Sequence, residues 1–249
     1  MNGRPLRVVA LQVGDAYPDS YVDRLGHMVE RHLPRPHEFV VFSDRPRSFR
    51  TDIVVRDCSS WGLKGYFNKL RLFDPSVTGH DPFIYLDITL VVRDDLGRLL
   101  TEADKVDASL IGVDDWNYPV LNSSVLLVRP DEQTRRVWED FRSGRRYQGS
   151  THGDQEYIHQ VFLANSPDRL RYWPSELVAS YKGLRKMAVA DPGRAREMYE
   201  RCVILKFHGH PRPHEVLAPW RSPVSTILRH PFRPRLWRFL GEEIEANWR

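Results

Sequence analysis

An aspartate inside the most apolar segment of the chain is the first residue whose type could do chemistry. Asp87 lies within FIYLDITLVV (83–92), a run that predicts a central strand buried on both faces. An ionised carboxylate in that setting is costly unless a metal, a cation or hydrogen bonds compensate its charge. Ligands of open parallel sheets bind at the carboxyl ends of strands, so Asp87 is either part of a ligand or metal site, or an aspartate that accepts from loop amides.

A histidine near the end of the chain is the second candidate. His208 follows an apolar segment at 203–207 and precedes Gly209, where the backbone could approach a phosphate closely. Carboxylates hold Mg²⁺ or Mn²⁺, Mn²⁺ also accepts imidazole, and such an ion neutralises a diphosphate leaving group. His208 and Asp87 could form such a site, although a lone histidine is more often structural.

Alternating strands and helices must position these residues. Apolar runs predict strands at 6–13, 38–42, 52–56, 83–92, 109–113, 120–128 and 203–207. Apolar spacing predicts helices from Ser20, over 66–73 with Pro75 closing it, after Asp131 and near Asp154. The order of strand, helix and strand indicates an α/β fold with βαβ units and a mainly parallel sheet.

Composition narrows the class of protein. The chain has 249 residues, of which 28% are charged and 41% hydrophobic, values typical of one folded domain. Cys58 and Cys202 form no metal-binding or disulfide pattern, so they are expected to be reduced thiols. No apolar run has the roughly 18 residues that cross a bilayer, and the N-terminus has no signal-type region, which together predict a cytoplasmic protein.

Several segments, taken in order, carry a resemblance to a known family. They are VGDAYPDSYVDRL, FVVFSD, WGLKGYFNKLRLFDP, FIYLDITLVV, LNSSVLLVRP, GDQEYI, WPSELVASYK and ILKFHGHPRPHEV. From about residue 7 to 217 the chain resembles bacterial glycosyltransferases related to the glycogenin-like family 8 enzymes. The resemblance implies a GT-A, Rossmann-like single domain over 1–218, with a central mixed, mainly parallel sheet flanked by helices. Residues 219–249 are then a basic amphipathic helical extension.

The resemblance also implies roles for individual residues, beginning with the donor. The nucleoside would be held by Val13, Gly14, Tyr17 and Asp44, and Lys69 would face the ribose or phosphate. The sugar and acceptor region would contain Asn122, Asp154 and Gln155, which together with Asp87 form the catalytic group. His208, Gly209 and Arg212 would clamp the metal and diphosphate.

Structural roles remain open for the same residues. Asn122 could tie a strand end through its amide, and Asp154 could be a helix N-cap. Lys69 and Arg212 could be plain surface charges. Tyr17 could be a packing residue rather than one that stacks on a base.

One departure from the family pattern affects the metal. Thr89 stands where the Asp-x-Asp pattern has its second aspartate, and a hydroxyl brings no charge. Three explanations follow: Mn²⁺ or Mg²⁺ held by Asp87, Thr89 and His208; a metal-independent enzyme in which Lys69, Lys206 or Arg212 neutralises the diphosphate; or a non-catalytic homologue.

The expected partners are a nucleoside diphosphate sugar, with UDP as the nucleotide, and a hydroxyl acceptor, with transfer that retains the anomeric configuration. The acceptor is left open: a glycan, a lipid-linked sugar, a small molecule or nucleic acid. The net charge of +4 and the arginines around 233–238 also suggest a nucleic-acid-directed protein, or a tail that touches an anionic membrane surface. The structural alternative is a C-terminal helix that packs on the domain.

Overall fold

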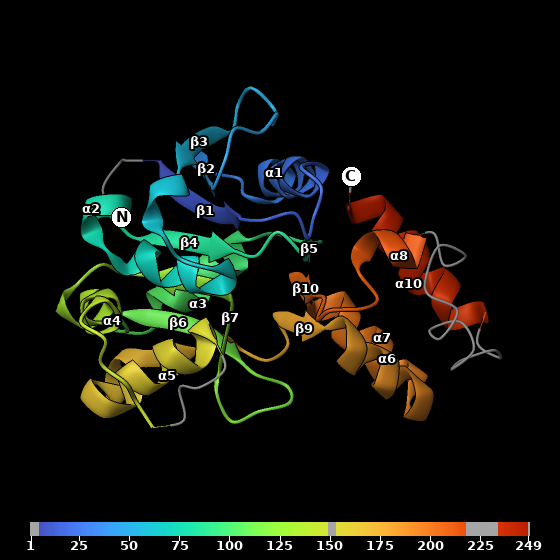
Figure 1. The fold of residues 1–249 in the computed structure, drawn as a ribbon. Coiled ribbons are helices and arrows are strands. Elements are labelled where there is room, and N and C mark those ends of the chain that lie inside the picture. The colour runs from blue at the N-terminus through green and yellow to red at the C-terminus, as the bar shows by residue number, and fades with distance from the viewer. Residues whose placement is uncertain (1–4, 149–152, 218–233, 249) are drawn as a thin grey trace. The chain divides into compact units, whose positions relative to one another are not determined.

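The computed structural model describes residues 5–148, 153–217 and 234–248. The chain forms two compact units, whose helices and strands are labelled in Figure 1. The first comprises Met1–Asp23, Arg35–Ile88 and Leu100–Trp173, and the second Arg24–Pro34, Thr89–Leu99 and Pro174–Arg249. Residues of α1 (Ser20–His32) and α3 (Gly97–Asp104) are divided between the two units.

The first unit is built on a mixed, mainly parallel sheet. Within the described residues it has seven strands in the order β3-β2-β1-β4-β7-β6-β8. Their bounds are β1 (Leu6–Gln12), β2 (His37–Ser43), β3 (Val54–Asp57), β4 (Phe83–Leu86), β6 (Leu110–Asp114), β7 (Leu121–Val128) and β8 (Leu170–Tyr172). All neighbours pair in parallel except β7, which is antiparallel to both β4 and β6. This arrangement confirms the predicted fold class.

Helices of the first unit share a core with one face of this sheet. They are η1 (Ser59–Trp61), η2 (Gly65–Phe73), α2 (Pro75–Thr78), α4 (Glu132–Arg142), α5 (Asp154–Asn165) and η3 (Pro167–Arg169), where η marks a 3-10 helix. Val9, Val40, Tyr85 and Leu126 are register neighbours across four strands, and all belong to the core that η2, α4 and α5 also enter. That face of the sheet therefore carries the side chains that meet η2 and α5.

The segment 83–92 is two strands, not the single strand that its apolar character predicts. β4 belongs to the large sheet, whereas β5 (Leu90–Val92) pairs with β10 (Ile204–Lys206) in the second unit. Every residue of both strands is buried, so the apolar run correctly predicts burial. It carries no information on which sheet each half joins, because pairing partners lie far away in sequence.

The helix expected over 66–73 also differs in detail. It is the 3-10 helix η2, and Tyr66 is 54% exposed, so this tyrosine lies outside the buried face predicted for it. Pro75 does not close η2 but starts α2, where Asp74 caps the helix by accepting from the Ser76 N–H at 2.8 Å. Proline is tolerated at a first helical position because it has no N–H to satisfy.

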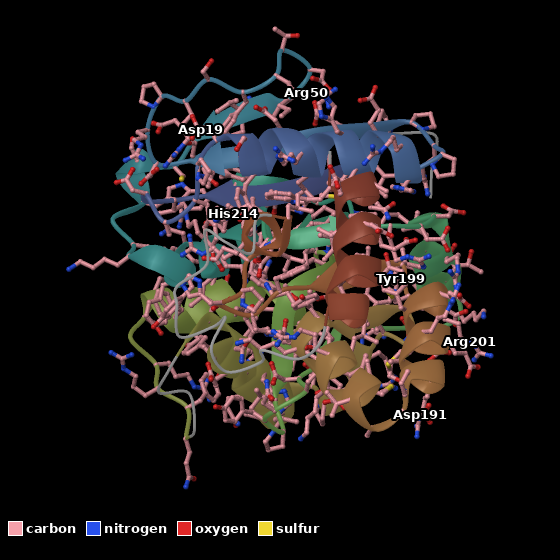
Figure 2. All side chains as sticks on the ribbon, turned by 90° about the vertical axis from the view of Figure 1, so that its right-hand side faces the viewer. Asp19, Arg50, Asp191, Tyr199, Arg201 and His214 are labelled. Carbon is pink, nitrogen blue, oxygen red and sulfur yellow. The ribbon has the colours of Figure 1, made fainter. Side chains whose placement is uncertain are left out.

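The described part of the second unit contains a small sheet and, besides its portions of α1 and α3, four helices. β10 lies between β5, which is antiparallel to it, and β9 (Val178–Ser180), which is parallel. The helices are α6 (Tyr181–Ala190), α7 (Pro192–Arg201), α8 (Pro213–Leu217) and α10 (Pro234–Asn247). Asp191 caps α7 by accepting from the Arg194 N–H at 3.0 Å, and Figure 2 shows Asp191 and Arg201 at the two ends of this helix.

The C-terminal helix packs on its own unit, as the structural alternative for the tail predicts. Ile244 and Trp248 are buried, and Arg24 places its guanidinium 4.3 Å from the centre of the Trp248 ring while donating to the Trp248 carbonyl at 2.7 Å. Residues 218–233, which include Arg233, lie outside the described residues. None of the helices that the structure describes is long and apolar enough to cross a membrane.

Candidate functional site

A buried lysine joins two of the predicted catalytic aspartates. The Lys69 Nζ lies 2.9 Å from Asp154 Oδ2 and 3.3 Å from Asp87 Oδ1. It also donates to the Ser123 carbonyl at 3.1 Å and to the Ser123 Oγ at 2.8 Å. We call Lys69, Tyr85, Asp87, Ser123 and Asp154 the Lys69 cluster; all five belong to the first unit.

The strand geometry explains how Asp87 reaches this cluster. Asp87 follows Tyr85 by two residues, and its N–H still donates to the Ser124 carbonyl at 2.9 Å, which continues the ladder past the end of β4. Side chains two apart in a strand share a face, so Asp87 points to the face that η2 and α5 cover. The Tyr85 hydroxyl donates to Asp87 Oδ1 at 2.7 Å.

An irregularity in β7 brings Ser123 to the same face. The register between β6 and β7 shifts between Ile111 and Val113, and Leu121 and Leu126 enter the same core although strict alternation would place them on opposite faces. Bulges of this kind re-aim side chains. Gly112 accommodates the irregularity, because a Cβ at this position would overlap the Leu121 side chain.

The helix α5 supplies the second carboxylate. Asp154 is the first residue of α5 and lies next to its N-cap, which is Gly153, so the predicted N-cap role of Asp154 is wrong. Its side chain instead accepts from the Ser123 hydroxyl at 2.6 Å in addition to Lys69. A carboxylate in the first turn is also favoured by the helix dipole.

The charges of the cluster are set by mutual contact. Burial lowers the pKa of Lys69, but the neighbouring Asp154 and Asp87 carboxylates outweigh it and raise the pKa above its ordinary value, so the side chain is an ammonium. Burial, followed by the Asp87 charge, raises the pKa of Tyr85 well above its ordinary value, which keeps the phenol protonated as a donor. Within the cluster, two carboxyl side chains therefore share one ammonium.

The predicted nucleoside residues form a second group in this unit. The Gly14 N–H donates to Asp44 Oδ2 at 2.9 Å, and Gly14 has φ +71, a conformation that glycine adopts without strain. Val13 is half-buried against the core, and Tyr17 lies 5.1 Å from Tyr21 between ring centres, a packing contact. The loop after β1 and the end of β2 are thus joined.

Arg47 holds this group together and was not predicted from the sequence. Its side chain is 3% exposed and donates to Asp19 Oδ1 at 2.9 Å, Asp44 Oδ1 at 3.0 Å and the Gly14 carbonyl at 2.7 Å. Burial raises the pKa of Asp44, but the Gly14 N–H and the Arg47 guanidinium lower it below its ordinary value overall. No local pattern singles out Arg47, because Asp19 and Gly14 are distant in sequence.

Asn122 has the structural contacts that were its alternative role. Its Nδ2 donates to Asp115 Oδ2 at 2.8 Å, and its Oδ1 accepts from the Ser124 N–H at 3.1 Å and the Ser124 hydroxyl at 2.6 Å. The amide therefore ties the start of β7 to the turn before it. Gln155 is half-buried at the second position of α5, beside Asp154.

The remaining predicted residues belong to the second unit. Thr89 is buried, and its Oγ1 accepts from the Lys206 Nζ at 3.2 Å. His208 is half-buried, and Gly209 has φ +59. The Arg212 N–H donates to Glu215 Oε2 at 2.7 Å, which secures the loop that follows β10.

The residues of the predicted metal site are divided between the two units: Asp87 belongs to the first, and Thr89 and His208 belong to the second. No group of three or more His, Cys, Asp and Glu side chains in the described part of the chain could hold a metal ion, but the predicted site has only two residues of these types and is not tested by this finding. The Asp87 Oδ1 and the Thr89 Oγ1 each have a lysine ammonium nearby, at 3.3 and 3.2 Å. A divalent cation on either oxygen would lie near that ammonium, and the two positive charges would repel each other.

The α/β fold of the chain is that of GT-A glycosyltransferase structures, in agreement with the expected class. The galactosyltransferase LgtC, solved with donor and acceptor sugar analogs, matches with a TM-score of 0.59 at 18% identity, over 94% of this chain and 99% of LgtC. The glycosyltransferase GlyE of Streptococcus pneumoniae TIGR4 matches with a TM-score of 0.62 at 16% identity, over 98% of this chain but 62% of GlyE. Mouse xyloside xylosyltransferase 1 matches with a TM-score of 0.52 at 14% identity, over 84% of this chain and 98% of that enzyme.

No family model matches the chain, and no curated protein does. Identities this low show a common fold alone.

Proposed function

We propose that the protein is a glycosyltransferase that moves a sugar from a nucleoside diphosphate sugar to a hydroxyl acceptor. The observation that carries this proposal is the Lys69 cluster, which gathers two of the predicted catalytic aspartates on the GT-A sheet. UDP is the nucleotide that the family 8 resemblance favours. LgtC, GlyE and xyloside xylosyltransferase 1 are glycosyltransferases by name, which supports the same class of reaction.

The charge of the cluster suits the chemistry of transfer. The bond from the anomeric carbon to the diphosphate oxygen breaks, the acceptor oxygen bonds to that carbon, and the acceptor hydroxyl loses its proton. Positive charge develops on the sugar ring as the bond breaks. Preorganised carboxylates beside the ring stabilise that state without having to reorganise. Asp87 and Asp154, held by Lys69, would supply this field and accept hydrogen bonds from sugar hydroxyls.

The group around Gly14 would hold the nucleoside. Asp44 and Arg47 lock the loop after β1 before a ligand arrives, so binding would cost less ordering entropy. Transfer with retention of configuration is our proposal from the family 8 resemblance. Product analysis by NMR of the newly formed glycosidic bond tests it directly.

The first test is a thermal-shift panel. UDP, GDP, CDP, ADP and their common sugars are each added with Mn²⁺, with Mg²⁺ and with EDTA. A ligand that binds only the native state raises the apparent stability, by about 2.7 kcal/mol at a hundredfold excess over Kd. Stabilisation by one nucleotide supports the proposal and names the donor class, whereas no shift with any nucleotide refutes it.

Turnover then separates an enzyme from a silent binding protein. We expect Asp87→Ala to abolish sugar transfer with the fold kept, because Asp87 reaches the cluster from beyond the end of β4 and is only partly buried. Asp104→Asn, at the exposed end of α3, is the matched control and should transfer normally. Full activity in Asp87→Ala would show that the site is assigned wrongly.

A further inference from the structure

A buried histidine of α5, which the sequence did not single out, holds the start of β7. His159 is 6% exposed, and its Nδ1 accepts from the Leu121 N–H at 2.9 Å. The Tyr172 hydroxyl of β8 lies 3.4 Å from the same ring nitrogen. A backbone amide can only donate, so Nδ1 carries a lone pair and the neutral ring has its proton on Nε2. We call the contact between the His159 ring and the Leu121 N–H the His159 clamp.

The strand next to this clamp is irregular. β6 pairs with residues 121–122 on one side of the register shift and with residues 127–128 on the other. Ser123 lies between these two paired segments. A regular ladder fixes each residue through backbone hydrogen bonds to its neighbours, whereas the extra residues of an irregular stretch depend on other contacts. The position of Ser123 therefore depends on what holds the start of β7.

The helix α5 contacts this stretch at two points. At its first turn, Asp154 accepts from the Ser123 hydroxyl at 2.6 Å. Further along the helix, His159 accepts from the Leu121 N–H. Ser123 is also the residue whose carbonyl and Oγ accept from Lys69. A movement of β7 relative to α5 would thus separate Ser123 from the other members of the Lys69 cluster.

Protonation of the ring would break the clamp. An imidazolium has an N–H on both ring nitrogens, so its Nδ1 would face the Leu121 N–H as a second donor. Of the described titratable side chains, those that face the ring are Asp114 at the end of β6 and Tyr172 of β8, and β7 contributes none. Burial raises the pKa of Tyr172, which keeps its hydroxyl a neutral donor.

The surroundings of His159 keep the ring neutral at pH 7. Burial lowers the pKa of His159 below its ordinary value, and the Asp114 carboxylate opposes that shift to a smaller extent. The unfolded chain therefore takes up this proton before the folded one does. The stability that the neutral ring contributes is complete above about pH 6.5 and is lost as the pH falls from there toward the folded pKa.

We propose that neutral His159 is a positioning residue of the Lys69 cluster, and that protonation of its ring releases the start of β7 and disrupts the site in acid. The inference rests on the proposed glycosyltransferase function and deepens it, because it concerns regulation of the same site. His159 acts through the Leu121 N–H on Ser123. Ser123 in turn contacts the lysine and the carboxylate that the cluster needs.

NMR of the ¹⁵N-labelled chain tests the clamp without any ligand. At about pH 7.5 the His159 ring should show the Nε2–H tautomer. Between about pH 7.5 and pH 5, protection of the Leu121 amide from hydrogen exchange should fall by about tenfold or more, as expected for loss of a hydrogen bond. In His159→Asn, whose side-chain oxygen can replace Nδ1 and does not titrate, protection should change by less than about twofold. His159→Leu has no acceptor and should lose this protection at both pH values.

The pH profile of sugar transfer tests the positioning role. Release of UDP from UDP-glucose, UDP-galactose and UDP-N-acetylglucosamine should fall in acid by up to about tenfold per pH unit in the native protein. His159→Asn should match the native rate within about threefold at pH 7.5 and keep at least about ten times more of it at pH 5. His80→Asn, which changes an exposed histidine of the same unit, is the matched control and should keep the native profile. Circular dichroism of each variant at both pH values establishes that it is folded.

The outcomes separate the two proposals. An Nδ1–H tautomer, or protection of the Leu121 amide that does not change with pH, would overturn the clamp. A fall in transfer that is the same in His159→Asn as in the native protein would overturn the positioning role and leave the glycosyltransferase proposal standing. Absence of UDP release at every pH, with the clamp titrating as expected, would refute the proposed function with these donors and the positioning role that rests on it.

Discussion

Lys69→Met removes the charge that holds the Lys69 cluster together, and its cost can be worked from the contacts. The ammonium lies within 3.3 Å of both Asp154 and Asp87, and the side chains of Lys69 and Asp154 are 7% and 9% exposed. Removing one partner of a buried ion pair typically costs about 3–5 kcal/mol, because the other charge stays buried without compensation. In a chain of this size that loss corresponds to a fall in Tm of roughly 10 °C.

The pH dependence of that loss follows from the raised pKa of Lys69. A group whose pKa is higher in the folded state contributes its full stability below its unfolded pKa, and that contribution is lost as the pH rises through the folded pKa. The difference in unfolding free energy between the native protein and Lys69→Met should therefore be constant from about pH 6 to pH 9. It should shrink above about pH 10.5, where Lys69 of the unfolded chain loses its proton while the folded protein still keeps the ammonium.

Urea unfolding followed by circular dichroism, repeated across this pH range, measures the difference. Lys105→Met, which removes a mostly exposed lysine of the same unit, is the control and should stay within about 0.5 kcal/mol of the native protein. Sugar transfer should also be lost in Lys69→Met. A loss of less than about 1 kcal/mol together with normal transfer would refute the view that Lys69 compensates the two carboxylates.

Two further predictions follow from other buried groups. Arg47→Met should weaken nucleotide binding and destabilise the protein by about 2–4 kcal/mol, because Asp19, Asp44 and the Gly14 carbonyl lose a common donor. Titration calorimetry measures the nucleotide affinity, and urea unfolding measures the stability. Unaltered nucleotide affinity would contradict the positioning role of Arg47. Burial raises the pKa of the Cys58 thiol to about 12 and that of the Cys202 thiol to about 11. Neither thiol should therefore react with a disulfide reagent at pH 8 until the chain is unfolded. Rapid labelling of the native protein would contradict this prediction, because it would show that a thiol is accessible.

Local patterns predicted much of the fold. The face of α1 that carries Tyr21, Leu25, Met28 and Val29 is buried as its spacing indicates. Asp131 caps α4 with a capping box, accepting from the Thr134 N–H at 2.9 Å while the Asp131 N–H donates to the Thr134 hydroxyl. These features depend on neighbours within a few residues, so the chain displays them without its tertiary structure.

Three members of the Lys69 cluster, Lys69, Asp87 and Asp154, were predicted from the sequence, but the contacts between them were not. A charged residue in an apolar strand signals that Asp87 has a partner, yet the pattern cannot say which one. Tyr85 could have been found, because it lies two residues before Asp87 and therefore on the same face of the strand. Ser123 could not, because an irregular register between β6 and β7 brings it to the cluster.

By itself, the sequence determined most strands of the large sheet, the helices α1, α4 and α5, and which residue types are available for chemistry. It did not predict β8, β9, α3, α6 or α7. The tertiary structure alone decided that β4 and β5 enter different sheets, that Lys69 lies between two carboxylates and that Lys206 faces Thr89. The physical reason is range: helix periodicity and capping act over one turn, whereas strand pairing and burial of charge join residues that are far apart along the chain. Whether a lysine such as Lys69 is a surface charge or the centre of a site depends on which side chains the tertiary structure places around it.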